Sequence, residues 1–453
     1  MSNINESSTQ NQEWNPLSRI TLYFFSAYFL LHIIPFDYKF YGDFFHRFSG
    51  LTYETLFQIA HYTPQFTGTK PHFLDWLVIA ILAGIITAMW LAIEKKKGIK
   101  VQHDHLLYVV RSVVRYRLAI AVFAYGFIKF FPLQSPYPSI SNLNTAYGDL
   151  TDWKMFSQSL GIVPGYQSFL GGVEIFAGLA LLWRKTASIG AFFVIVFTGN
   201  VFFSNLAYTG GEYVYSFYLI TLAIFVFWYD LKRLADLTTF EVKAFPNQYK
   251  PTFIKGSLKV SVYLFKGLVL FLFFGLYSFQ IASDFNAKNI YHYPTTPGLK
   301  DAAGIYQVAS FVINNDTLPH SKTDTVRWND VVFETWNTIS IRVNKNIVVD
   351  TANVESVTLA EKDRNYEAEG TAGRLYYSYT TDTVNNKLIL INKNKHYKDD
   401  SLFLNYERTA DRSIILKGKN SYNDSLYVLL KYIDKKYLLK EAFKTGRRKG
   451  LKI

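Results

Sequence analysis

Residues 118–133 read LAIAVFAYGFIKFFPL, an apolar run that carries a single lysine, Lys129, close to its end. A charged side chain at the centre of a bilayer costs from roughly 2.5 to 17 kcal/mol, so such a residue is kept for a function or is tightly paired. The run is one of about seven similar stretches before residue 284. The sequence therefore predicts a polytopic α-helical membrane bundle.

Apolar stretches close to 20 residues in length indicate membrane-spanning helices. We expect them at residues 17–35, 74–93, 118–133, 166–183, 187–207, 213–229 and 260–282. Residues 36–73 are dense in aromatic side chains, which is typical of interfacial or re-entrant helices. Arg111 and Arg115 are four residues apart and so share one helical face, which we interpret as a cytoplasmic-surface helix leading into the third span.

The basic loops predict the orientation of the chain in the membrane. Residues 94–100, 184–185, 232–233 and 243–259 are rich in lysine and arginine and follow the second, fourth and sixth spans. By the positive-inside rule these loops are cytoplasmic. We expect a multi-pass inner-membrane protein with a cytoplasmic N-terminus, an uncleaved first span and a periplasmic C-terminal domain.

Composition excludes several classes of chemistry. The 453-residue chain has no cysteine, which removes disulfides, iron–sulfur clusters, covalently attached haem and thiolate zinc sites. His103 and His105 lack a carboxylate cluster, and His32 has no second histidine four residues away, so we expect no metal site. The net charge is +13, and the runs of lysine and arginine flank the spans. A nucleic-acid surface would instead have basic residues interleaved with aromatic side chains on a soluble face, so we expect no nucleic-acid partner.

After residue 300 the hydrophobic period changes to two, which indicates strands. Short alternating runs are separated by Asn-Asp, Asn-Asn and Lys-Asp-Asp turns. The clearest runs are at residues 306–313, 338–343, 375–380, 387–391, 402–407 and 426–432. About eight or nine strands predict an all-β extracytoplasmic domain, either a lipocalin-like barrel, which we favour, or a β-sandwich.

Span direction places several polar side chains in the outer half of the membrane. Lys129 lies about one turn below Pro132, with Tyr125 one turn deeper on the same face. Glu174 is about 12 Å from the outer end of the fourth span. In the fifth span, Asn205 is close to the outer end and Asn200 about 7–8 Å deeper.

This cluster admits two interpretations. Lys129 and Glu174 could simply form a structural ion pair, or Lys129 could extend to the headgroups. In the functional interpretation the two are catalytic groups in a pocket that opens outward. The long loop at residues 134–165 is then expected to form an ordered lid, and Gln134, Tyr147 and Asp149 join the two asparagines as candidate substrate-binding residues.

Four segments resemble the DoxX-like membrane proteins, a family that includes the DoxD-type thiosulfate:quinone oxidoreductases. They are residues 117–134, 147–150, 166–191 and 200–208, and the resemblance covers roughly residues 110–235. Lys129, Gly171 to Glu174 and Asn205 match family positions. Thr209 stands where the family suggests an acidic residue.

The resemblance completes the expected domain organisation. In order, we expect a polar tail at 1–16, two spans with their aromatic and surface segments at 17–116, a DoxX-like four-helix core at 117–235, a connection and seventh span at 236–283, a linker at 284–300 and the β-domain at 301–453.

Two functions follow from this organisation. The first is a quinone-linked oxidoreductase component with a polar pocket in the outer leaflet, with quinone as a non-covalent cofactor. The second is a non-catalytic membrane anchor whose β-domain binds a ligand or a periplasmic partner protein.

Overall fold

The computed structural model describes residues 14 to 445, apart from residues 49, 69, 100, 245 to 255, 352 to 356, 358 and 359. Most of the expected polar tail and part of the basic stretch at 243–259 lie outside the described residues. The chain forms two compact units. The first contains residues up to 125, 173–202 and 213–278, and the second contains 126–172, 203–212 and 279 onward.

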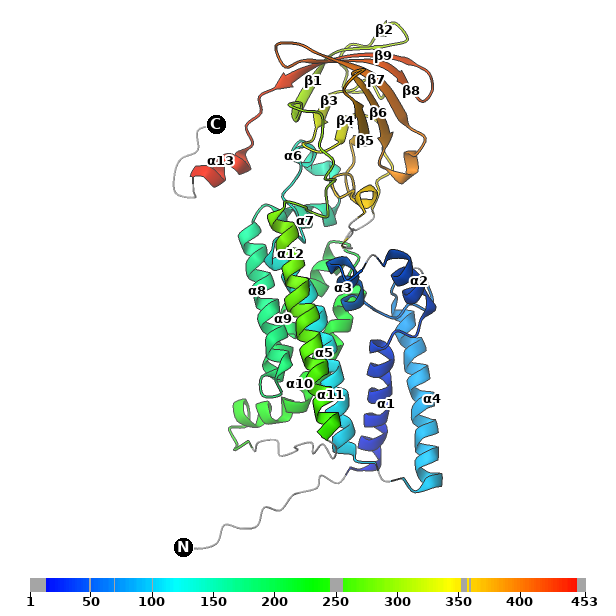
Figure 1. The fold of residues 1–453 in the computed structure, drawn as a ribbon, viewed down its shortest axis with the longest axis vertical. Coiled ribbons are helices and arrows are strands. Elements are labelled where there is room, and N and C mark those ends of the chain that lie inside the picture. Colours follow the sequence, from blue (N-terminus) through cyan, green and yellow to red (C-terminus); the bar gives the residue numbers. More distant parts are fainter. Residues whose placement is uncertain are drawn as a thin grey trace. The chain divides into compact units, whose positions relative to one another are not determined.

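Helices, most of them long, dominate the chain before residue 287 (Figure 1). They are α1 (Pro16–Ile33), α2 (Tyr38–Arg47), α3 (Tyr53–Ala60), α4 (Phe73–Lys97), α5 (His103–Phe130), α8 (Pro164–Leu182), α9 (Ala187–Ala207), α10 (Tyr213–Thr238), α11 (Gly256–Val269) and α12 (Tyr277–Asn286), with a π-helical stretch, η2 (Leu270–Leu276), between the last two.

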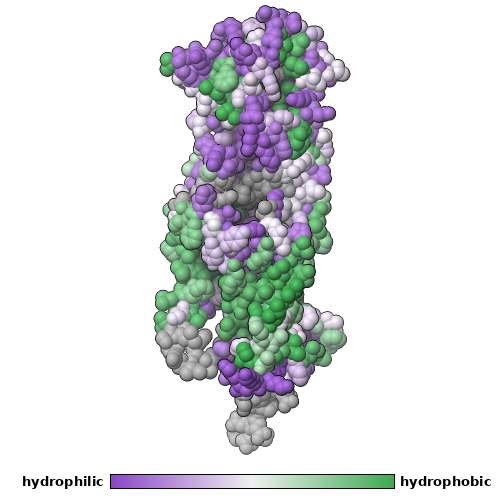
Figure 2. Space-filling view, turned by 90° about the vertical axis from the view of Figure 1, so that its right-hand side faces the viewer, coloured by the Kyte–Doolittle hydropathy of each residue, from purple (hydrophilic) through white to green (hydrophobic). Residues whose placement is uncertain are grey.

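Six helical segments among the described residues are long and apolar enough to cross a membrane. They are Pro16–His46, Phe73–Lys97, Pro164–Leu182, Ala187–Ala207, Tyr213–Thr238 and Val260–Asn286. Figure 2 shows hydrophobic side chains gathered over the helical part, whereas the surface of the β-domain is mostly hydrophilic. The expected membrane bundle is thus confirmed, and the protein is a multi-pass membrane protein.

The expected third span is the second half of α5, which is one continuous helix of 28 residues. The helix expected to lead into the third span is therefore present, but its arginines do not lie on the surface, because Arg111, Arg115 and Arg117 are all buried. Leu118 and Ala121 have no exposed surface. Because α5 packs against protein on its sides, its arginines can be satisfied by neighbouring helices, which also explains why it is less apolar than the other spans.

Arg117 ties the short helix α3 to α5. Its guanidinium donates to the carbonyl oxygens of Ala60 and Tyr62, each at 2.8 Å. Ala60 is the last residue of α3 and Tyr62 follows the helix, and at this end backbone acceptors have no partner within the helix and a nearby cation is favourable. The aromatic segment between the first two spans therefore contains two short helices, α2 and α3, of which α3 is held against α5.

The C-terminal domain is a closed antiparallel barrel. Its described strands are β1 (Gly304–Ile313), β3 (Asp330–Phe333), β4 (Thr338–Arg342), β5 (Arg374–Asp382), β6 (Lys387–Asn392), β7 (Ser401–Arg408), β8 (Ile414–Asn420) and β9 (Ser425–Ile433), with β2 (Asp316–Thr317) added to the edge of β1. Each strand pairs with the next, and β1 pairs with β9 to close the barrel. This confirms the expected barrel, and the alternative of a β-sandwich is wrong.

Side chains fill the interior of the barrel. Strand β6 alternates exposed and buried positions along its whole length, as expected for a strand with one face in a core. The inward side chains form one hydrophobic cluster, in which Phe311, Phe333, Leu390 and Leu430 are at most 1% exposed. The barrel is therefore a packed core.

The segment at residues 134–165, the connecting segment, is ordered and is attached to the barrel. It contains α6 (Ile140–Leu143), a 3-10 turn η1 (Tyr147–Asp149) and α7 (Asp152–Gly161). Leu150 forms an antiparallel β-bridge with Thr371, and the amide of Thr151 donates to the carbonyl of Gly370 at 2.9 Å. Gly370 has φ of +65°, and a Cβ there would lie 2.6 Å from the Thr151 hydroxyl, so the approach requires glycine.

Candidate functional site

The predicted site residues are divided between the two units. Tyr125, Glu174 and Asn200 belong to the first unit. Lys129, Gln134, Tyr147, Asp149 and Asn205 belong to the second. No single unit contains the whole predicted cluster.

Lys129 lies in the last turn of α5 and is only 7% exposed. The neighbouring α8 approaches this turn closely through Gly171. A Cβ at position 171 would lie 2.3 Å from the amide nitrogen of Phe130 and 2.5 Å from the carbonyl oxygen of Gly126. The first glycine of the Gly-x-x-Glu pattern therefore brings the two helix backbones together at the level of Lys129.

Gln134 is half-buried at the start of the connecting segment, and its backbone takes part in a polar cluster. The Nε2 of His292 lies 2.9 Å from the carbonyl oxygens of both Leu133 and Gln134. Because carbonyl oxygens only accept, Nε2 carries the proton. The side chain of Gln167 on α8 forms two hydrogen bonds with the backbone of Ser135, at 3.0 and 3.2 Å.

Hydroxyl groups extend this cluster toward the barrel. The Ser135 hydroxyl lies 3.3 Å from that of Ser157, which in turn lies 2.7 Å from the phenol oxygen of Tyr366. Sequence reasoning missed these residues because they are far apart in the chain. The sequence contains one indication of this cluster, namely that the segment at 134–165 is expected to be ordered.

The asparagines of α9 have different environments. Asn205 is 2% exposed, and its Oδ1 accepts from the amide of Glu212 at 3.1 Å. A Cβ at Gly210 would lie 2.2 Å from that Oδ1, so the turn after α9 is built closely around the amide. Asn200, by contrast, is exposed. Asn205 thus holds the turn between α9 and α10, and the two asparagines do not share a face.

The other predicted residues also have defined surroundings. Tyr125 packs against the rings of Phe57 and Tyr215, with centroid distances of 5.3 and 5.6 Å, and Glu174 is half-buried on α8. Tyr147 is 78% exposed. The carbonyl of Asp149 accepts from the amide of Ala372 at 2.7 Å, so this residue helps to attach the connecting segment to the barrel.

Buried charges join the connecting segment to the loops at the end of the barrel. Both carboxylate oxygens of Glu334 accept hydrogen bonds at the start of α6, from the amides of Ile140 and Ser141 at 3.1 and 2.7 Å. Glu367 has no exposed surface and pairs with Lys393 at 2.6 Å. Glu334 and Ile140 are 194 residues apart in the sequence.

Lys154 on α7 is 2% exposed, and its Nζ lies 3.5 Å from the ring centre of Tyr366. Burial lowers the pKa of the Lys154 ammonium, and burial raises the pKa of the Glu369 carboxyl. In each case the charge of the other residue opposes the shift. This pair was not predicted, because nothing in the spacing of residues 154 and 369 places them together.

Among the described residues, no group of three or more His, Asp or Glu side chains is arranged to hold a metal ion. Comparison of the chain with family models, with curated proteins and with solved structures gives no match.

Proposed function

We propose that the chain is a DoxX-like, quinone-linked oxidoreductase component of the inner membrane, in which Lys129 binds the polar head of the quinone. The observation that carries this proposal is the burial of the Lys129 ammonium in the last turn of α5. A buried cation in a membrane helix is a functional-site hypothesis in its own right. The basic loops after the second, fourth and sixth expected spans support a cytoplasmic N-terminus and a periplasmic barrel.

The residue types suit this ligand. A quinone head presents two carbonyl oxygens, which accept hydrogen bonds, and the ammonium of Lys129 and the phenol of Tyr125 are donors. Glu174, which is half-buried, would hold or release a proton. The engagement of Asn205 in the turn after α9, and the exposure of Asn200 and Tyr147, argue against these three residues as quinone ligands.

A second candidate function is the binding of a periplasmic partner protein by the β-domain. The packed interior of the barrel disfavours a ligand inside it. Its outer surface carries the exposed apolar side chains of Ile389, Ile391 and Phe403 on β6 and β7, where Ile389 is paired with Phe403 across the two strands. Such a patch on a periplasmic domain is typical of an interaction surface.

Co-purification separates the two functions. The protein is purified in a mild detergent, and its organic extract is analysed for quinone by chromatography and absorbance. The first proposal predicts quinone at close to one molecule per chain. A quinone-to-lipid ratio in the extract no higher than that of the starting membrane would contradict the quinone proposal and favour the binding of a partner protein.

A further inference from the structure

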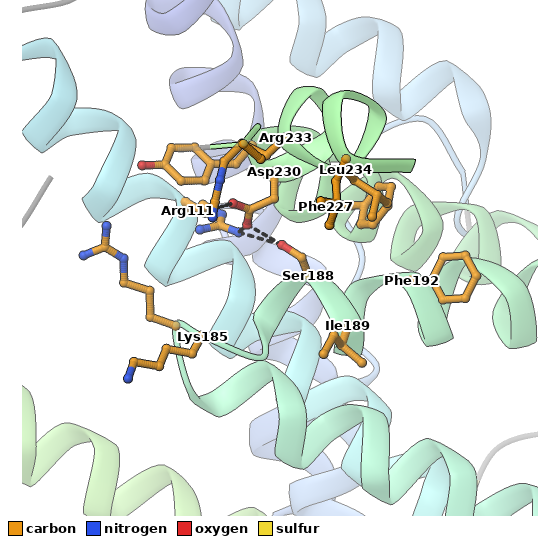
Figure 3. A pocket seen from close by; sticks show the side chains of 13 residues that line it. Arg111, Lys185, Ser188, Ile189, Phe192, Phe227, Asp230, Arg233 and Leu234 are labelled. Atoms are coloured by element: carbon orange, nitrogen blue, oxygen red, sulfur yellow. Dashed lines mark hydrogen bonds and ion pairs between the residues drawn. The ribbon is translucent and has the colours of Figure 1, made fainter. Parts of the chain in front are cut away.

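A large cavity that none of the predicted site residues lines is found in the helical unit, with a volume of about 780 Å³. It lies between the start of α9 and the last turns of α10, and Arg111 of α5 also lines it (Figure 3). Four cationic side chains line it, Arg111, Arg184, Lys185 and Arg233, whereas Asp230 is the single carboxylate among its described lining residues. The formal charge of the lining is therefore +3.

One carboxylate is shared by two guanidinium groups at this site. Asp230 accepts from Arg111 at 2.9 Å through Oδ2 and from Arg233 at 2.9 Å through Oδ1. Arg111 is also held by the carbonyl of Val226 and the hydroxyl of Ser188. Figure 3 shows the side chains of Arg111, Ser188 and Asp230 pointing toward one another. Arg111 and Arg233 are thus fixed in position by Asp230. The lining as a whole still carries excess positive charge, which suits a negatively charged ligand.

The remaining wall is apolar. Ile189 and Phe192 on α9 and Leu237 on α10 are half or more exposed, and the rings of Phe192 and Phe227 meet at a centroid distance of 6.2 Å. In a membrane helix such surfaces face acyl chains. A ligand that fills the cavity therefore needs an anionic group at one end and hydrocarbon at the other.

Flanking tryptophans indicate the depth of the cavity. Trp183 precedes Arg184, Trp228 precedes Tyr229, and both indole side chains are largely exposed. Exposed tryptophan marks the level of lipid headgroups. The charged rim consequently lies where a lipid phosphate would lie, and the apolar wall lies where its chains begin.

We infer that this cavity is a specific binding site for an anionic phospholipid, with the phosphate between Arg184, Lys185 and Arg233 and an acyl chain against Phe192 and Phe227. This inference is independent of the quinone proposal, because none of the residues proposed to bind the quinone lines the cavity. Charge complementarity and the apolar wall together favour a lipid over a soluble anion.

The test uses the full-length protein in detergent, titrated with phosphatidylglycerol or with phosphatidylcholine of the same acyl chains. Bound lipid is counted by native mass spectrometry. We expect one phosphatidylglycerol to bind at least tenfold more tightly than phosphatidylcholine. Substitution of Arg184, Lys185 and Arg233 by glutamine should remove that preference, and Arg111 is left intact so that the helices stay joined.

A matched control neutralises three other cations of the same unit. Lys95, Lys96 and Lys97 are exposed in the last turn of α4 and line no part of the cavity. Their replacement by glutamine should leave the preference unchanged. An equal loss in both triple variants, equal binding of the two lipids, or displacement of the lipid by millimolar inorganic phosphate would each overturn the inference.

Discussion

His292 shows how a single side chain can make folding depend on pH. Its ring is buried against the backbone of Leu133 and Gln134, and burial lowers its pKa to about 3, with the nearby charges of Lys154 and Arg364 acting in the same direction. The unfolded chain protonates this imidazole at about pH 6.5. Between those values the unfolded state binds more protons, so stability is lost as the pH falls through this range.

We predict that His292→Gln flattens this dependence. Glutamine keeps an N–H donor for the two carbonyls but does not titrate in this range. Between pH 6.5 and 4 the wild-type protein should lose about 3 kcal/mol more stability than the variant. Thermal unfolding in detergent across this range measures the difference, and parallel curves for the two proteins would contradict the assignment.

Individual residues also show where sequence reasoning succeeds and fails. The apolar surroundings of Lys129 correctly predict that it is buried. The sequence predicts that Asn200 and Asn205 line one pocket. The two are five residues apart, which is about 1.4 turns of an α-helix, so their side chains point to different sides of α9. The sequence predicts a surface position for Arg111, whereas the residue is buried and paired with Asp230. Because Asp230 is more than 100 residues away in the chain, no local pattern indicates this pair.

The contact between α5 and α8 depends on Gly171. The following residue offers a matched comparison, since a Cβ at Gly172 would meet only the Phe130 ring at 4.0 Å, whereas at Gly171 it would collide with backbone.

We predict that Gly171→Ala destabilises the protein by about 1–3 kcal/mol, the usual cost of overpacking. Gly172→Ala should be neutral or slightly stabilising, because alanine favours helix. Unfolding midpoints of the two variants, measured in the same detergent, give the comparison. Equal midpoints would show that α8 does not approach α5 as closely as described.

Most elements follow from periodicity, and the exceptions have physical causes. The six alternating runs expected in the β-domain correspond to β1, β4, β5, β6, β7 and β9. Strands β3 and β8 are not among the expected runs. Three consecutive residues of β3 are buried. Strand β8 contains Gly418, where the backbone of β7 approaches closely. Neither strand shows a clear period of two. Likewise α5 is less apolar than a lipid-facing span because it is buried by protein.

The molecule as a whole combines a membrane bundle with a packed barrel, and both were predictable in kind. Composition and loop charge indicated a membrane half and a β-rich half. The attachment of residues 134–165 to the barrel was not predictable, because it rests on contacts such as those of Glu334 with Ile140 and Ser141. The linker expected at 284–300 is likewise packed, with Tyr291, His292 and Tyr293 buried.

The central claim is that the buried ammonium of Lys129 binds a quinone head. It is tested most directly by titrating the purified protein with a short-chain quinone and following the quenching of tryptophan fluorescence. Lys129→Met should weaken binding by about tenfold or more, since a hydrogen bond to a charged group contributes roughly 1.5–3 kcal/mol. Lys266→Met, which removes a half-buried lysine from α11, should bind as the wild type does. Full quinone affinity in Lys129→Met would contradict the account and leave Lys129 a structural cation.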